Sequence, residues 1–171
     1  MPSEGERLHR QVTNGNSLGA QEAGMPDLLY LDYNCFQRAF DDPQQARIRM
    51  EAAACEQIFE DAEKAVVDLV WSFMHEDENV LCPFADRKLE IRRLSAACRV
   101  QVVPDEQVRT LAKKLETEAG LSAKDAVHVA AAHCAGAAFF VTCDDRILSK
   151  ASRLPVEIVV INPVQYVLRK G

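Results

Sequence analysis

Residues 121–145 have the sequence LSAKDAVHVAAAHCAGAAFFVTCDD, which carries the strongest indication of the architecture. Ser122 is a good helix N-cap, and the segment up to residue 136 is almost entirely apolar after Asp125, so we expect a central, buried helix. The apolar run at 138–142 then predicts a buried strand. A buried helix that leads directly into a buried strand is typical of a parallel sheet covered by helices.

The same alternation continues outward in both directions along the chain. The runs LLYLD at 28–32, AVVDLVW at 65–71 and VEIVVI at 156–161 predict further strands, and RVQVV at 99–103 is a possible one. The predicted fold class is α/β, with a three-layer α/β/α arrangement around a central, mainly parallel sheet of about five strands. Helices are expected at 43–64, with a start at Asp41-Asp42-Pro43, and at 73–79, 84–98, 105–120, 143–151 and 162–171.

Length and composition favour one folded domain at residues 27–171, preceded by a disordered tail at 1–26 that holds four of the seven glycines. No run is long and apolar enough to span a membrane, and the N-terminus has no apolar core of a signal peptide. The cysteines form no CxxC pair, which argues against a zinc finger or a thioredoxin-like motif, and we expect buried, reduced thiols and a cytoplasmic location. They are Cys35, Cys55, Cys82, Cys98, Cys134 and Cys143.

The formal net charge of −6 argues against a protein that coats duplex nucleic acid through basic charge. The charge is uneven, because residues 41–79 carry a net −8 and residues 80–171 a net +4. The stretch 85–99 is rich in basic residues, and we favour a solvated helix face for it over a surface that steers phosphates. Its basic residues are Arg87, Lys88, Arg92, Arg93 and Arg99, of which the first four are weaker candidates for contacts with a nucleic-acid backbone.

Acidic residues recur where the predicted strands end. Asp32 ends the first strand, Asp144 and Asp145 follow the strand at 138–142, and Asp125 lies in the first turn of the buried helix. Ligands of open α/β sheets bind at the carboxyl ends of the strands, and converging carboxylates repel each other unless a divalent cation neutralises them. Oxygen ligands select Mg²⁺ or Mn²⁺, which can activate water for phosphodiester hydrolysis. Taken singly, each acid could instead be a helix cap.

Other chemistries have little support in the sequence. It contains no GxSxG, GxGxxG or GxxxxGK[ST] motif. His128 lies three residues after Asp125 on one helix face and could neighbour the site, although a satisfied, half-buried histidine is the simpler interpretation. His128 and His133 are five residues apart, a poor spacing for a metal pair on a helix.

Four segments of the chain resemble PIN-domain nucleases, and the resemblance spans about residues 27–167. The strongest, LSAKDAVHVAAA at 121–132, is similar to the family's DAxHxAxA helix, and the other three are LDYNCF at 31–36, WSFMHEDEN at 71–79 and FFVTCDD at 139–145. The resemblance implies a PIN-like fold and metal-dependent hydrolysis of RNA. It extends to VapC-type toxins of toxin–antitoxin pairs, except that the helix at 43–64 is longer here.

The resemblance also implies the site. Its catalytic and metal-binding acids would be Asp32, Glu78, Asp125 and Asp144, holding one or two Mg²⁺ or Mn²⁺ ions. The second acid is ambiguous, because Glu76 and Glu78 both follow Ser72 and cannot both face the site well. The spacing from Ser72 favours Glu78. The supporting residues would be Asn34, Thr142, Asp145 and Glu76.

The implied partners are an RNA substrate, a cognate antitoxin and a second copy of the chain in a homodimer. Two other function classes stay open. A PIN-like module could bind RNA or regulate without turnover. A phosphotransfer enzyme of haloacid-dehalogenase type also begins from a strand-end aspartate, but it needs a second acid two residues later, where this chain has Asn34.

Overall fold

The structure, a computed structural model, describes residues 24–171. The five strands of the described part form a single sheet in which all neighbours run parallel, in the order β3-β2-β1-β4-β5. This confirms the predicted three-layer α/β/α class, including the possible strand. The predicted tail at 1–26 lies outside the described residues except for its last three. The strands are β1 (Asp27–Leu31), β2 (Val67–Ser72), β3 (Cys98–Val102), β4 (Phe139–Val141) and β5 (Val159–Ile161).

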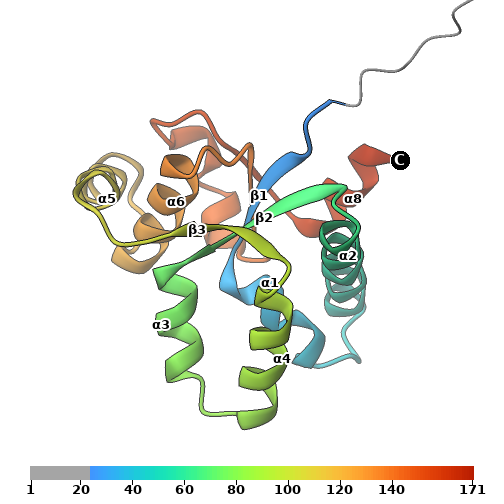
Figure 1. The fold of residues 1–171 in the computed structure, drawn as a ribbon. Coiled ribbons are helices and arrows are strands. Elements are labelled where there is room, and N and C mark those ends of the chain that lie inside the picture. The colour runs from blue at the N-terminus through green and yellow to red at the C-terminus, as the bar shows by residue number, and fades with distance from the viewer. Residues whose placement is uncertain (1–23) are drawn as a thin grey trace, which may run out of the picture.

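Helices connect the strands, and the described residues contain none long and apolar enough to cross a membrane. Figure 1 shows α5 and α6 on one side of the sheet and α2 and α8 on the other. The helices are α1 (Tyr33–Gln37), α2 (Ala46–Glu63), α3 (Phe73–Leu81), α4 (Ala85–Ser95), α5 (Glu106–Ala119), α6 (Ala123–Cys134), α7 (Asp145–Leu148) and α8 (Pro163–Lys170). Two 3-10 turns, η1 (Arg38–Phe40) and η2 (Ala151–Arg153), complete the set.

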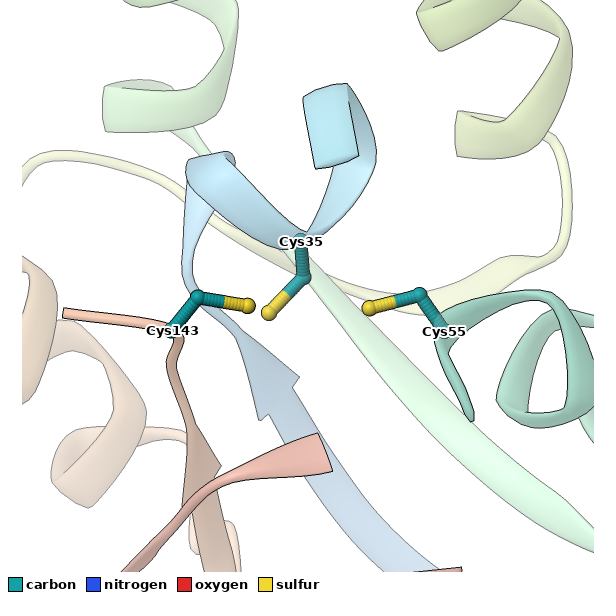
Figure 2. Close-up of side chains that lie close together, drawn as sticks. All are labelled: Cys35, Cys55 and Cys143. Atoms are coloured by element: carbon teal, nitrogen blue, oxygen red, sulfur yellow. The ribbon is translucent and has the colours of Figure 1, made fainter. Parts of the chain in front are cut away.

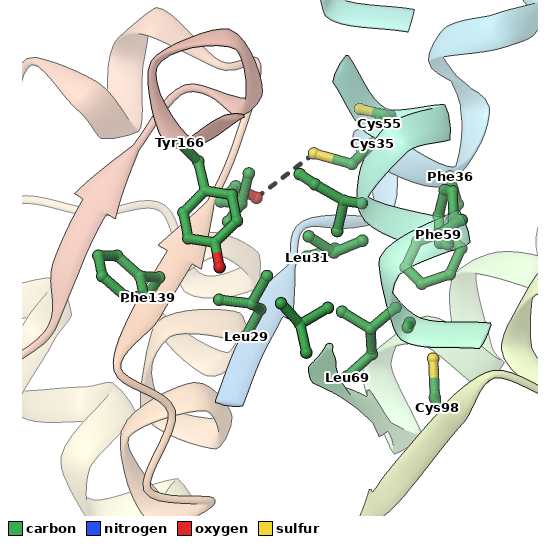
Figure 3. Packing of buried hydrophobic residues seen from close by; sticks show 14 of the residues in the cluster. Leu29, Leu31, Cys35, Phe36, Cys55, Phe59, Leu69, Cys98, Phe139 and Tyr166 are labelled. Carbon is green, nitrogen blue, oxygen red and sulfur yellow. Dashed lines mark hydrogen bonds between the residues drawn. The ribbon is translucent and has the colours of Figure 1, made fainter. Parts of the chain in front are cut away.

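Each face of the sheet has its own hydrophobic core, because successive side chains of a strand point to opposite faces. Leu29 and Leu31 of β1 pack with α1, α2, α4 and α8, where Phe36 and Phe59 contribute aromatic rings (Figure 3). Tyr30 points the other way and packs with α5, α6 and α7. The buried helix at the centre of the second core is α6, as its apolar sequence predicts.

Local signals account for most helix ends. The Ser122 side chain caps α6, Gly120 ends α5 in a left-handed conformation with a φ of 67°, and Ser72 and His75 form a capping box at α3. The predicted start of α2 at residues 41–43 is wrong. Asp42 Oδ1 accepts a hydrogen bond from the Gln44 N–H at 3.0 Å, which closes a turn, and the helix begins only at Ala46.

Glu51, a buried acid in α2, contacts side chains from η1, from α2 and from the start of α8. Glu51 is 1% exposed, and its Oε1 accepts hydrogen bonds from Arg47 Nε at 2.8 Å and from Asn162 Nδ2 at 2.7 Å. Arg38 Nη2 lies 2.9 Å from Glu51 Oε2, an ion pair without hydrogen-bond alignment. Glu51 therefore connects η1 and α2 with the residue that caps α8.

The strand order fixes where a ligand can bind. The chain proceeds from β1 outward to β2 and β3, and it then returns to the other side of β1 to form β4 and β5. The order thus reverses between β1 and β4, and ligands of such sheets bind at this switch point, outside the carboxyl ends of the strands. Asp32 follows β1 and Thr142 follows β4 at this point.

Candidate functional site

Asp32 lies at the switch point and is almost fully buried, with 7% of its surface exposed. Its Oδ2 atom accepts hydrogen bonds from Thr142 Oγ1 at 2.7 Å and from Asn34 Nδ2 at 2.9 Å. Asp32 occupies the N-cap position of α1, but its carboxylate makes no capping bond. The helix-cap explanation therefore does not account for this acid.

Asn34 and Thr142 hold the ends of β1 and β4 together. Asn34 Nδ2 donates to Thr142 Oγ1 at 3.2 Å, and Asn34 Oδ1 accepts from the Cys143 N–H at 3.2 Å. The Asp144 N–H donates to Thr142 Oγ1 at 3.0 Å. These bonds orient the Asp32 carboxylate and fix the loop that carries Asp144.

The two acids after β4 point to different partners. Asp144 caps α7 by accepting from the Arg146 N–H at 2.8 Å, and the Arg146 guanidinium pairs with the same carboxylate at 2.7 Å. This pairing holds the pKa of Asp144 below its usual range, against the effect of burial. Asp145 is exposed and binds Arg47 of α2 through two hydrogen bonds of 2.7 Å. Its carboxylate does not join Asp32.

Glu78 and Glu76 lie on α3 and have separate surroundings. Glu78 Oε1 accepts from His128 Nε2 at 2.5 Å, and its Oε2 pairs with Lys124 Nζ at 2.7 Å, both from α6. Burial raises the pKa of Glu78, but His128 and Lys124 bring it below its usual range. Glu76 instead forms two hydrogen bonds with Arg92 of α4, at 2.6 and 2.9 Å. The two glutamates thus face in different directions.

The acids influence one another electrostatically without forming a tight cluster. Burial raises the pKa of Asp32, Glu78 and half-buried Asp125 raise it further, and His128 and Thr142 oppose these effects. Yet in the part of the chain that the structure describes, no three carboxylates lie within 4.8 Å of one another. Asp32, Glu78 and Asp125 therefore form a loose acidic group, and Asp144 is paired with Arg146.

A buried chain of hydrogen bonds leads from the core to Glu78. Tyr30 OH lies 2.6 Å from Ser72 Oγ and 2.7 Å from His128 Nδ1. The Glu78 carboxylate can only accept, so His128 Nε2 donates to it. His75 accepts from the Ser72 N–H through Nδ1 and donates through Nε2 to the Leu31 carbonyl at 2.7 Å. Burial and nearby His128 lower the pKa of His75 to about 3, so this ring is neutral and structural.

Comparison with known proteins agrees with this geometry. The sequence profile described as the PIN domain matches residues 29–154, which is most of the chain. The chain belongs to the PIN-domain family. The match contains residues 31–36 at the end of β1, the α3 segment, α6 and the β4 end, which are the four segments that carry the resemblance in the sequence. No curated protein sequence matched the chain.

Two solved structures share the PIN fold at low sequence identity. FitAcB from Neisseria gonorrhoeae superposes with a TM-score of 0.52 and 19% identity, covering 79% of this chain and 97% of that one. VapBC2 from Rickettsia felis, solved bound to a DNA fragment from their promoter, gives a TM-score of 0.57 and 13% identity. That superposition covers 79% of this chain and 98% of the other. At such identities the likeness concerns the fold alone.

Sequence reasoning alone did not find the cations of this PIN-domain site. Lys124 contacts Glu78, and Arg146 contacts Asp144, although each lies within two residues of a predicted acid. The position of Lys124 one residue before Asp125 could have indicated a charge near the site. Tyr30 gave no signal, because a tyrosine inside an apolar strand is indistinguishable from an ordinary core residue.

Proposed function

We propose that this PIN domain is a metal-dependent ribonuclease that hydrolyses phosphodiester bonds. The observation that carries the proposal is the state of Asp32 at the switch point. Two side chains bind its Oδ2 atom, and no hydrogen bond from the described residues reaches Oδ1. Oδ1 has no hydrogen-bond partner among these residues but is not fully buried, so it is accessible from the solvent side. One oxygen is thus fixed, and the other is available to a ligand.

The chemistry of the donors fits a hard divalent cation. Asp32, Glu78 and Asp125 offer oxygen atoms only, a set that favours Mg²⁺ or Mn²⁺ over Zn²⁺. The negative charges of Glu78 and Asp125 repel that of Asp32 and raise its pKa. A divalent cation would relieve this repulsion. Asp144 would join the ligands when Arg146 moves aside. When bound, the ion supplies an activated water and neutralises charge on the phosphate.

The chain's own side chains orient the acids. Thr142 and Asn34 hold the Asp32 carboxylate in one orientation. The carboxylate therefore needs less rearrangement when a ligand binds. His128 and Lys124 do the same for Glu78 from α6. Buried Tyr30 fixes the His128 ring from behind. Asn34, His128, Lys124 and Tyr30 lie in helices or strands, and Thr142 directly follows β4, which keeps the arrangement rigid.

A groove beside Glu78 supports a nucleic-acid substrate. Its lining includes Glu78 itself, the cationic side chains Lys124 and Arg87, and the rings of Tyr33 and Phe84. Cations bind phosphates, and an exposed ring such as that of Phe84 can stack on an unpaired base, whereas Tyr33 is only 5% exposed. This combination suits a single strand better than a duplex. Phe84 is 55% exposed, and Arg87 lies over its ring at 4.7 Å.

The basic stretch at 85–99 contributes less than its charge suggests. Arg92 pairs with Glu76, Arg93 with Glu90, and Arg99 with Asp68. These intramolecular pairs favour the solvated helix face over a surface that steers phosphates. Arg87 remains the best candidate of the stretch for contact with RNA, because it lines the groove beside Glu78.

Removal of divalent metal tests the proposal directly. Purified protein is expected to cleave a single-stranded RNA in the presence of Mn²⁺ or Mg²⁺, to lose the activity in EDTA, and to regain it when excess Mn²⁺ is restored. Cleavage is measured by gel electrophoresis of an end-labelled RNA. Cleavage that persists in EDTA would indicate a metal-independent ribonuclease contaminant. RNA that binds in the presence of metal and is never cut would favour the non-catalytic alternative.

The two glutamates of α3 provide a matched pair of variants. Glu78→Gln is expected to lower cleavage by at least about 100-fold, since it removes a negative charge beside Asp32. Glu76→Gln has the same chemical change on the same helix but affects only the contacts with Arg92 and Trp71. It is expected to retain activity within about threefold, because an exposed ion pair contributes little. A larger loss in Glu76→Gln than in Glu78→Gln would reverse the assignment.

The protein partners and the location stay predictions. The family resemblance implies a cognate antitoxin and a homodimer, and the two similar structures are those of FitAcB and VapBC2. Apolar side chains are exposed where α3 meets α4, including Leu81 at 80% and Leu89 at 72%, and they offer a surface for another protein.

A cytoplasmic location agrees with the free state of all six cysteines.

A further inference from the structure

Three cysteines from distant parts of the chain meet behind the candidate nuclease site. Cys35 comes from α1, Cys55 from α2, and Cys143 from the loop after β4. Their sulfur atoms all lie within 4.8 Å of one another, and each residue is at most 5% exposed. Figure 2 shows the three side chains pointing toward a common centre. In the described part of the chain, no other group of three cysteine, histidine or acidic side chains lies this close together.

The spacing of the sulfurs suits a metal ion at their centre. A metal–sulfur bond of about 2.3 Å places three sulfurs of a planar trigonal site about 4 Å apart. The sulfurs therefore need to move inward by less than about 1 Å. Small side-chain rotations supply such a movement, because Cys35 is held only by weak hydrogen bonds from its thiol to Asn34 Oδ1 and the Val141 carbonyl, both 3.4 Å long.

The surroundings provide both access and a compensating charge. Cys35 and Cys55 line a groove of about 510 Å³ that also contacts Arg38, Phe36 and Phe59, so an ion has a path to the sulfurs. Arg38 also lines the groove and lies 2.9 Å from both Glu51 and Asp41. Its guanidinium offsets part of the negative charge that three thiolates bring.

We propose that Cys35, Cys55 and Cys143 form a binding site for one thiophilic cation in three-coordinate sulfur ligation, with Cu(I) as the representative ion. Soft thiolate ligands select such ions over Mg²⁺ and Mn²⁺. Zn²⁺ ordinarily takes a fourth ligand, and no fourth candidate side chain of the described residues completes the group. Binding converts the three thiols to thiolates and releases their protons to solvent. This site is separate from the acids of the proposed nuclease, and it stands whether or not the protein cleaves RNA.

Metal titration of the reduced, full-length protein tests the site. The protein is titrated without oxygen with Cu(I) supplied from a chelator of known affinity, and the bound complex is measured by X-ray absorption. We expect one ion per chain with three sulfur neighbours at about 2.3 Å. Fewer than three sulfurs, or a shell with added nitrogen or oxygen ligands, would overturn the three-coordinate assignment. This measurement uses the wild-type chain and needs no variant.

Cysteine variants then identify the ligands. Cys55→Ser is expected to weaken Cu(I) binding by at least about 100-fold, because even the outer-shell partners of metal ligands contribute 10–100-fold. The matched control is Cys98→Ser, since Cys98 is equally buried but lies outside the group, and it should keep the wild-type affinity. Equal affinity of both variants would reject the site. If Cys55→Ser does not fold, Cys55→Ala serves in its place, with circular dichroism as the check on folding.

Discussion

Asp32→Asn is expected to lower metal-dependent RNA cleavage by at least about 1000-fold while the protein stays folded. The substitution removes the negative charge from the oxygen that the structure leaves available to a ligand. The amide oxygen of the asparagine can take the place of Oδ2 and still accept the hydrogen bond from Thr142 Oγ1. Burial and neighbouring acids raise the pKa of Asp32, so the charge is unfavourable in the folded state without metal. The variant should therefore unfold at the same temperature as the wild type or a higher one.

The control for this substitution is Asp61→Asn, the same chemical change at the C-terminal end of α2. That end leads into the start of β2, so Asp61 lies at the opposite edge of the sheet from Asp32. Its activity should stay within about twofold of the wild type, as surface substitutions away from the site usually have small effects. Cleavage is compared by initial rates at saturating Mn²⁺, and stability is compared by thermal unfolding without metal, in EDTA. Equal activity of Asp32→Asn and the wild type would reject the catalytic assignment.

Glu51→Ala is expected to reduce the free energy of unfolding by about 3–5 kcal/mol, the effect of breaking a buried ion pair by removing one partner. Glu51 is 1% exposed, and its loss leaves the largely buried Arg38 guanidinium with Asp41 as its only remaining carboxylate partner among the described residues. The Asn162 side chain also loses the acceptor that ties the start of α8 to α2. Urea unfolding followed by circular dichroism measures the change.

The matched control is Glu56→Ala, which removes an exposed glutamate from the same helix. It should change the free energy of unfolding by less than about 0.5 kcal/mol. Adding Arg38→Met to Glu51→Ala should recover part of the stability, because it removes a largely buried charge that then has only Asp41, at 2.9 Å, as its partner. A loss below about 1 kcal/mol in Glu51→Ala would mean that Asp41, 2.9 Å from Arg38, is sufficient to compensate its charge.

The sequence was sufficient for the fold wherever the signal was local. The apolar run after Asp125, the cap at Ser122 and the left-handed residue Gly120 each depend on a few neighbouring residues, and they predicted α6 and the end of α5 correctly. The start of α2 was wrong because Asp42 and Pro43 suit a turn as well as a helix start. The short helix α1 was missed, since five residues are too few to show a periodicity.

The site was predictable only in part, because its contacts join side chains that are distant in the sequence. The parallel sheet places strand-end acids at one edge, so Asp32 and the residues after β4 could be expected near each other. The pairing of Asp144 with Arg146 and of Asp145 with Arg47 depends on side-chain rotation, which no sequence pattern encodes. The three-cysteine group was hidden in the same way, because its members have no metal-binding spacing along the chain.

The contact between Asp32 and Thr142 has a consequence for synthesis of the protein. The two residues are 110 positions apart, and β1 can pair with β4 only after all the residues between them have been made. A nascent chain on the ribosome holds Asp32 early but lacks the hydrogen bonds that orient it. Long-range pairing of this kind also folds slowly. The proposed nuclease would thus gain the hydrogen bond from Thr142 that orients Asp32 only after β4 has been synthesised.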